Sequence, residues 1–119
     1  MKQYLGIDVV EISRIEKAVA RWGDSFLERI YTAEELRLYR GKLPSLAARF
    51  AAKEAAVKAL GVNELIYHDI EITAESGGRP SITLYGRARS QASELGITDL
   101  TVSLSHSREY AAAVVSGIV

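Results

Sequence analysis

The sequence of 119 residues contains no cysteine and no long apolar run. Without cysteine there is no disulfide framework, no thiol nucleophile and no thiolate metal site, so any bound metal must be held by oxygen or imidazole, which favours hard cations. No apolar stretch approaches the roughly 18 residues of a membrane span, and the first residues lack the pattern of a signal peptide. We therefore expect a cytoplasmic protein with no membrane partner.

The sequence also has no net charge, because 15 basic residues balance 15 acidic ones. This balance gives no reason to expect nucleic acid as a partner. The charge is nevertheless uneven: residues 1–60 hold 11 Lys and Arg against 8 Asp and Glu, and residues 61–119 hold 4 against 7. Between positions 36 and 61, Glu54 alone opposes six basic residues. This bias predicts that the first half faces a small phosphorylated ligand or an acidic protein.

Several sequence patterns of common enzymes are missing as well. There is no glycine-rich phosphate loop followed by Lys and Ser or Thr, no Gly-x-Ser-x-Gly elbow and no His-Glu-x-x-His motif. Hydrolase and nucleoside-triphosphatase functions therefore lose their usual support. Chemistry must be sought in isolated carboxylates, basic residues and the two histidines.

What the sequence does contain is typical of one globular domain over residues 1–119. Hydrophobic residues make up 48% and charged residues 25%, close to the averages of soluble domains. The expected fold class is α+β, a mostly antiparallel sheet packed against helices in the order β-α-α-α-β-β-α-β-β. The expected elements are a strand over 4–10 covered on both faces, helices over 13–22, 32–40 and 46–60, a hairpin over 68–85, a helix over 86–95, and strands over 100–104 and 110–119.

Local signals support these boundaries. Ser13 with Glu16, and Thr32 with Glu35, fit the capping box in which both partners satisfy backbone donors. Trp22 falls on the apolar stripe of the first helix and is expected to face the core. A short turn is expected after residue 24, and Gly61 is expected to end the alanine-rich helix.

Two carboxylates stand out from their surroundings. Asp8 lies within an apolar strand, where a carboxylate needs a positive partner such as a cation or a basic side chain. Glu54 stands alone among basic residues on the alanine-rich helix. If that helix packs beside the strand, the two carboxylates converge and supply the usual protein share of a Mg²⁺ site. The alternatives are that Asp8 caps the following turn and that Glu54 forms an ordinary surface ion pair with Lys58.

His106 is a third candidate, because it lies in an expected turn at 105–108 between two strands, beside two serines and an arginine. Loops at strand ends often hold ligands, but a histidine there can equally be solvent-exposed and idle.

Three sequence blocks resemble a known family. They are GIDVVEISRI at residues 6–15, RFAAKEAAVKALG at residues 49–61, and VSLSHS at residues 102–107. In this order they are similar to the holo-acyl-carrier-protein synthases, the small 4′-phosphopantetheinyl transferases. The resemblance covers nearly the whole chain, and its middle block is the most specific of the three. Ala48 and Val57 depart from residues that are common in the family.

The resemblance implies transfer of 4′-phosphopantetheine from coenzyme A to a serine of apo acyl carrier protein, with adenosine 3′,5′-bisphosphate as the second product. It implies that Asp8 and Glu54 hold Mg²⁺ and that Lys58 contacts the phosphates. Either Glu54 or a water held by the metal would act as base. The implied role is in fatty acid biosynthesis, in a homotrimer with active sites between subunits.

The remaining roles also come from the resemblance. Arg49, Lys53, Gly61 and His106 would hold the nucleotide end of coenzyme A, including its 3′-phosphate. Arg14 and Arg21 would contact an acidic helix of the carrier protein. A non-catalytic module that binds coenzyme A or a nucleotide is the alternative function, and an adaptor for an acidic partner is a third. The binding module would gain nothing from Asp8 and Glu54 unless a metal intervened, and the adaptor would need no metal.

Overall fold

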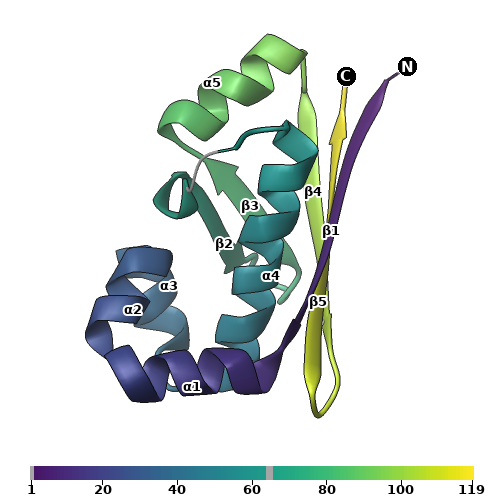
Figure 1. Ribbon diagram of the computed structural model, residues 1–119. Coiled ribbons are helices and arrows are strands. Elements are labelled where there is room, and N and C mark those ends of the chain that lie inside the picture. Colours follow the sequence, from purple (N-terminus) through teal and green to yellow (C-terminus); the bar gives the residue numbers. More distant parts are fainter. Residues whose placement is uncertain (1, 64–65) are drawn as a thin grey trace.

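The computed structural model describes residues 2–63 and 66–119 as one α+β unit (Figure 1). The predicted fold class is confirmed. The elements are β1 (Gln3–Glu11), α1 (Ile12–Trp22), α2 (Asp24–Ile30), α3 (Ala33–Tyr39), α4 (Leu43–Leu60), the 3₁₀ turn η1 (Tyr67–Asp69), β2 (Ile70–Ala74), β3 (Pro80–Leu84), α5 (Gly86–Leu95), β4 (Asp99–His106) and β5 (Tyr110–Ile118). The segment expected as a short turn after residue 24 is the seven-residue helix α2.

The strands form two separate antiparallel sheets rather than one. The larger has the order β1-β5-β4, and the smaller is the β2-β3 hairpin. In the larger sheet Asp8 lies opposite Ala113, and His106 lies opposite Ala111. Figure 1 shows every helix on the same side of this sheet, with α4 running along it.

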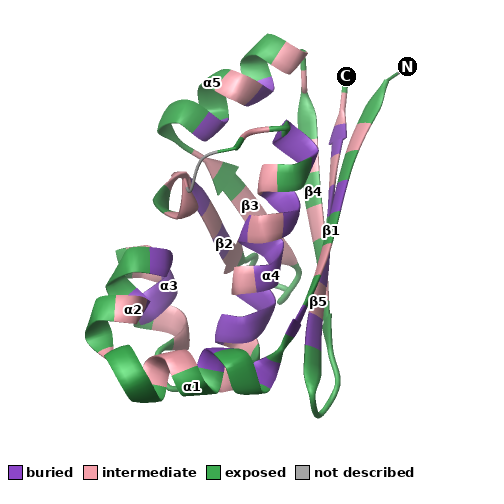
Figure 2. Ribbon diagram, in the orientation of Figure 1, coloured by how far each residue is buried: buried purple, intermediate pink, exposed green. Residues whose placement is uncertain are grey.

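The other side of the larger sheet is open to solvent. Leu5, Ile7 and Val9 are 60%, 64% and 58% exposed, and Val114 of β5 is 39% exposed. The inward residues of β1 alternate with them (Figure 2). The expectation that β1 is covered on both faces is therefore wrong for this chain alone, because no described element packs on the outer face.

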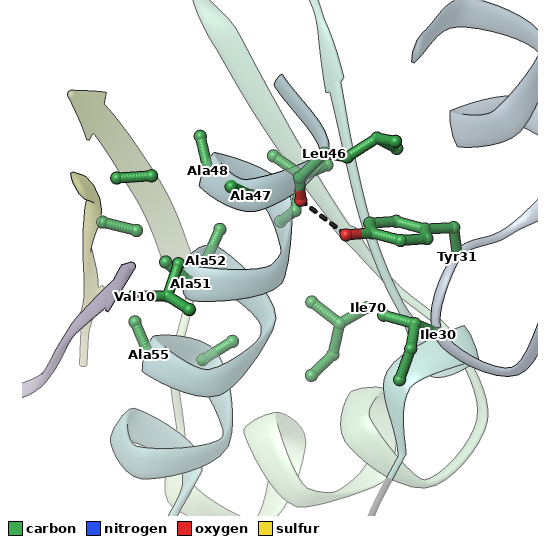
Figure 3. Close-up of a cluster of buried hydrophobic side chains, with 14 of the residues drawn as sticks. Val10, Ile30, Tyr31, Leu46, Ala47, Ala48, Ala51, Ala52, Ala55 and Ile70 are labelled. Carbon is green, nitrogen blue, oxygen red and sulfur yellow. Dashed lines mark hydrogen bonds between the residues drawn. The ribbon is translucent and has the colours of Figure 1, made fainter. Parts of the chain in front are cut away.

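The core is centred on α4, whose alanines let neighbouring elements approach closely (Figure 3). Five of them have no exposed surface: Ala47, Ala51, Ala52, Ala55 and Ala56. α4 begins three residues earlier than expected because Pro44 occupies its first turn, where a missing N–H has no cost. Its last residue is followed by Gly61 with φ 68°, the predicted left-handed cap.

The two predicted capping boxes have opposite outcomes. At Thr32 the box is complete: its hydroxyl accepts from the Glu35 N–H, and the Glu35 carboxylate accepts from the Thr32 N–H at 2.8 Å. At Ser13 the prediction is wrong, because α1 starts directly after β1 and Ser13 is already its second residue. The chain turns from strand to helix without a loop, which leaves no position for a cap before Ser13.

In the part of the chain that the structure describes, no helix is both long enough and apolar enough to cross a membrane.

Candidate active site

Asp8 lies on the inward face of β1, and its positive partner is Lys58 of α4. The Lys58 ammonium donates to Asp8 Oδ1 at 3.1 Å and to the carbonyl oxygen of Ile7 at 2.9 Å. The Asp8 side chain is only 20% exposed, whereas that of Lys58 is 55% exposed. The predicted need for a positive partner is confirmed, and the capping alternative loses its support.

Glu54 lies one helical turn before Lys58 and contacts a residue from another element. The hydroxyl of Tyr67, in η1, donates to Glu54 Oε1 at 2.7 Å. Among the described residues Glu54 forms no ion pair with Lys58, so the surface-pair alternative is wrong.

The negative charges of Glu54 and Asp8 both act on the phenol of Tyr67. Burial raises the pKa of Tyr67 to about 12, and the hydrogen bond to Glu54 and the negative charges of Glu54 and Asp8 act in the same direction. The positive charge of Arg29 opposes them. Both carboxylates therefore favour the protonated phenol, although they come from β1 and α4.

Gly6 explains how β1 and α4 come so close. A Cβ placed on Gly6 would lie 1.8 Å from the carbonyl oxygen of Ala55 and 2.9 Å from the amide nitrogen of Ala59. The strand therefore lies directly against the backbone of the helix. Because Gly6 and Asp8 share one face of β1, and Ala55 follows Glu54, this contact sets the distance between the two carboxylates.

Lys53 was expected to bind the coenzyme, and the structure places it in the interior instead. Its side chain has no exposed surface, and its ammonium contacts Glu35 at 2.8 Å and the carbonyl oxygens of Tyr67 and Ile70 at 2.7 and 2.5 Å. All three of its N–H donors are thus engaged. Burial lowers the pKa of Lys53, and the charge of Glu35 opposes that shift. The expectation that Lys53 contacts phosphate does not fit this position, because its three donors are engaged and its side chain has no exposed surface.

Arg49 has a similar position one turn earlier. It is 8% exposed, donates to the carbonyl oxygen of Ile72 and to the hydroxyl of Tyr39 at 2.7 Å, and lies over the Tyr39 ring. Its guanidinium connects α4 to α3 and β2. The expectation that it binds the 3′-phosphate therefore does not fit its place in the core.

The other predicted residues are exposed and near the ends of their elements. His106 is the last residue of β4 rather than part of the turn, and Gly61 follows α4. In the larger sheet β5 lies between His106 and the strand that carries Asp8. Arg14 and Arg21 are exposed on α1.

Trp22 is 56% exposed, contrary to the expectation that it faces the core. Instead it borders two adjoining hollows, which share Trp22, Phe26 and Phe50. The first, about 440 Å³, reaches Arg14 and Arg21; the second, about 290 Å³, reaches Tyr67. A partly apolar groove thus leads from the basic face of α1 to the partner of Glu54.

A larger hollow of about 640 Å³ lies elsewhere, between α2 and α3. Two arginines line it, but Arg37 is paired with Glu34 and Arg40 with Asp24. Neither Asp8 nor Glu54 borders it. Size alone therefore does not identify the reactive site, and the carboxylate pair is the stronger candidate.

The donor set at the carboxylate pair fits Mg²⁺. Each carboxylate has one oxygen engaged, and no described residue donates to the other oxygen. No third carboxylate or histidine completes a metal-binding cluster within residues 2–63 and 66–119. Two carboxylates with open positions suit a cation that keeps several waters and takes other oxygens from substrate phosphates.

Comparison with known proteins identifies the family. Residues 4–115 match the family model of the 4′-phosphopantetheinyl transferase superfamily. The chain belongs to this superfamily. It is 54% identical over 113 residues to a holo-[acyl-carrier-protein] synthase of Dehalococcoides mccartyi, covering 94% of this chain and 95% of that one, and 50% identical over 114 residues to the one of Moorella thermoacetica, covering 92% and 88%.

Solved structures agree with the sequence relatives. The holo-[acyl-carrier-protein] synthase of Helicobacter pylori, crystallised with coenzyme A, is similar with a TM-score of 0.86 and 39% identity, covering 96% of this chain and 99% of that one. The synthase of Neisseria meningitidis is similar with a TM-score of 0.85 and 33% identity, covering 97% of each chain. The predicted family and the prediction of a transferase are confirmed.

Sequence reasoning overlooked Tyr67, whose hydroxyl contacts Glu54 in the candidate site of this phosphopantetheinyl transferase. The only local signal was an aromatic residue shortly before the β2-β3 hairpin, which is also an ordinary core position. Its hydroxyl reaches Glu54 only because η1 packs against α4 in the folded chain.

Proposed function

We propose that the protein is a holo-[acyl-carrier-protein] synthase that transfers 4′-phosphopantetheine from coenzyme A to a serine of apo acyl carrier protein. The observation that carries this proposal is that Lys58 of α4 pairs with Asp8 of β1, and that Gly6 lets β1 lie directly against α4 beside Glu54. Closely similar relatives bear the same name, and one similar structure contains coenzyme A.

Asp8 and Glu54 would hold a Mg²⁺ ion through their free oxygens. When bound, the ion would supply positive charge to the pyrophosphate of coenzyme A. Lys58 would contact the same phosphates, since its ammonium is at the site and more than half of its side chain is exposed. It would stabilise the charge that develops on the leaving oxygen.

The reaction breaks one P–O bond and forms another. The serine oxygen would attack the pantetheine-bearing phosphorus, and the bridging oxygen would leave with adenosine 3′,5′-bisphosphate. The serine proton must go to a base, and Glu54 is one of the two candidates that the sequence analysis names. Such a transfer requires positioning and charge stabilisation rather than a protein nucleophile, which agrees with the absence of cysteine.

The groove beside α1 would receive the carrier protein. Arg14 and Arg21 stand at one end of it and Tyr67 at the other. A partner with acidic residues near its modified serine would contact the arginines, and the serine would be directed toward Glu54. Rim charges of this kind act mainly on the rate of association and its dependence on salt.

The open face of the larger sheet supports assembly into a homotrimer. Leu5, Ile7 and Val9 form an apolar strip that a single chain leaves in water. Contiguous exposed apolar surface is typical of protein interfaces. A neighbouring subunit covering it would build active sites between subunits, with His106 and Gly61 toward the nucleotide end of coenzyme A. The cellular setting would be cytoplasmic fatty acid biosynthesis.

The experiment that tests the proposal is mass spectrometry of apo acyl carrier protein after incubation with this protein, coenzyme A and Mg²⁺. We expect the mass of one phosphopantetheine to be added, with adenosine 3′,5′-bisphosphate as product. Asp8→Asn and Glu54→Gln should each slow the reaction about a hundredfold or more, while the matched exposed variant Glu75→Gln retains the wild-type rate.

Two outcomes would contradict the proposal. Coenzyme A binding without any adduct on the carrier protein would favour the non-catalytic module. Wild-type rates of both carboxylate variants at limiting Mg²⁺ would refute the site.

A further inference from the structure

Tyr67 lies outside the three sequence blocks that resemble the family, but its hydroxyl contacts Glu54 at the candidate site. It donates to Glu54 Oε1 at 2.7 Å, which leaves Oε2 of that carboxylate without a described partner. The ring packs beside Phe50, with centroids 5.9 Å apart. Tyr67 thus contacts α4 in two places one turn apart.

The backbone of Tyr67 is fixed as firmly as its side chain. Its carbonyl oxygen accepts from the buried ammonium of Lys53 at 2.7 Å, and the same ammonium binds the carbonyl oxygen of Ile70 and the carboxylate of Glu35. A fully buried ion pair therefore anchors η1 to α4 and α3. The tyrosine hydroxyl extends from a rigid support rather than from a free loop.

We propose that Tyr67 is a positioning residue that orients the Glu54 carboxylate for metal binding. Glu54 has three side-chain torsions and is partly exposed, so its carboxylate would otherwise rotate. The hydrogen bond to Oε1 restricts that rotation and leaves Oε2 available to a metal ion. This inference rests on the proposed metal site, and it adds a group that does not itself touch metal or substrate.

The contribution of Tyr67 to metal binding should depend on its hydroxyl and not on its ring. Partners that hydrogen-bond to metal-ligating carboxylates orient the ligands, and their loss typically costs about 10- to 100-fold in metal affinity or activity. A tyrosine that served only to pack against Phe50 would do so equally well as phenylalanine. Tyr67→Phe therefore separates positioning from packing.

The test measures Mn²⁺ binding by electron paramagnetic resonance, with the full chain and without coenzyme A or carrier protein. We expect Tyr67→Phe to raise the dissociation constant for Mn²⁺ about tenfold. The midpoint of thermal unfolding should stay close to that of the wild type. In transfer assays, saturating Mg²⁺ should restore kcat, and the KM for coenzyme A should remain unchanged under those conditions.

Tyr85→Phe is the matched control, because the Tyr85 hydroxyl also donates to a glutamate, Glu71 at 3.3 Å, on the β2-β3 hairpin. It should leave Mn²⁺ binding unchanged. Equal Mn²⁺ affinity of the wild type and Tyr67→Phe would overturn the inference, as would an equal loss in Tyr85→Phe. If the wild type failed to bind Mn²⁺, both the inference and the proposed metal site would be overturned. If the wild type bound Mn²⁺ and carried out the transfer, and Tyr67→Phe matched it in both assays, only the positioning role would be refuted.

Discussion

The contact between Gly6 and α4 predicts that the smallest possible enlargement, Gly6→Ala, will disrupt both fold and site. The new Cβ would lie 1.8 Å from the Ala55 carbonyl oxygen and 2.8 Å from the carbonyl carbon. To reach even 3.0 Å from the oxygen, strand and helix must separate by about 1.2 Å. The opposing atoms belong to the helix backbone, so no side chain can rotate away.

The expected magnitude follows from that displacement. Overpacking a dense core typically lowers the free energy of unfolding by about 1–3 kcal/mol. A clash with backbone atoms should cost an amount at or above the upper end of that range. A loss of about 3 kcal/mol is a large share of the roughly 5–15 kcal/mol that stabilise a domain, and for a chain of this size it lowers the unfolding midpoint by about 10 °C. Separating β1 from α4 also moves Asp8 away from Glu54, so Mn²⁺ binding should weaken in whatever protein remains folded.

Urea unfolding and Mn²⁺ titration, both at one fixed protein concentration, measure the two effects. Gly77→Ala is the matched control, because a Cβ there meets nothing within 4 Å and should be neutral or slightly stabilising. Ala59→Gly should not rescue Gly6→Ala, since the clash is with main-chain atoms. A Gly6→Ala protein within about 1 kcal/mol of the wild type, with unchanged Mn²⁺ affinity, would refute the close approach of β1 and α4.

Three further predictions test other parts of the structure. Lys53→Met should destabilise the fold by about 3–5 kcal/mol in urea unfolding, because it leaves Glu35 buried without its ionic partner, and adding Glu35→Gln should recover part of the loss. Burial raises the pKa of Tyr31 far above the ordinary 10.0, so the unfolded state loses this proton first as pH rises. Stability must then fall above about pH 10 by up to roughly 1.4 kcal/mol per pH unit for this phenol, and Tyr31→Phe should fall less steeply. Arg14→Glu should slow carrier-protein binding at low salt without changing the affinity for coenzyme A; an unchanged KM for the carrier protein would exclude this docking face.

Local sequence signals predicted the elements that depend on neighbours along the chain. The capping box at Thr32 and the left-handed Gly61 are decided within four residues, and both formed as expected. The capping box predicted at Ser13 did not form, because β1 continues directly into α1 and Ser13 lies inside the helix. Patterns of a few residues predict a helix end well only where the chain has freedom to turn.

Burial was harder to predict than secondary structure. On α1 it decreases along the helix: Ile15 is 3% exposed, Val19 is half-buried and Trp22 is 56% exposed. Helical periodicity places these residues on one face but does not say where the helix leaves the core (Figure 2). The prediction that β1 is covered on both faces failed for the opposite reason. Its apolar sequence predicts a covering partner, which a single chain does not supply.

The charged residues of α4 show why the most specific sequence block did not reveal each residue's role. Successive helical residues are rotated by about 100°, so neighbours in the block face different elements. Arg49 and Lys53, four residues apart, share a stripe directed at β2 and lie in the core. Glu54 and Lys58, also four apart, share the next stripe and contact Tyr67 and Asp8. The acceptors that bury Lys53 come from segments 14 to 18 residues away, and Asp8 is 50 residues from its ammonium partner, so neither could be read from the block itself. One stripe of this helix therefore anchors the support on which Tyr67 is held, while the other carries the carboxylate that Tyr67 orients.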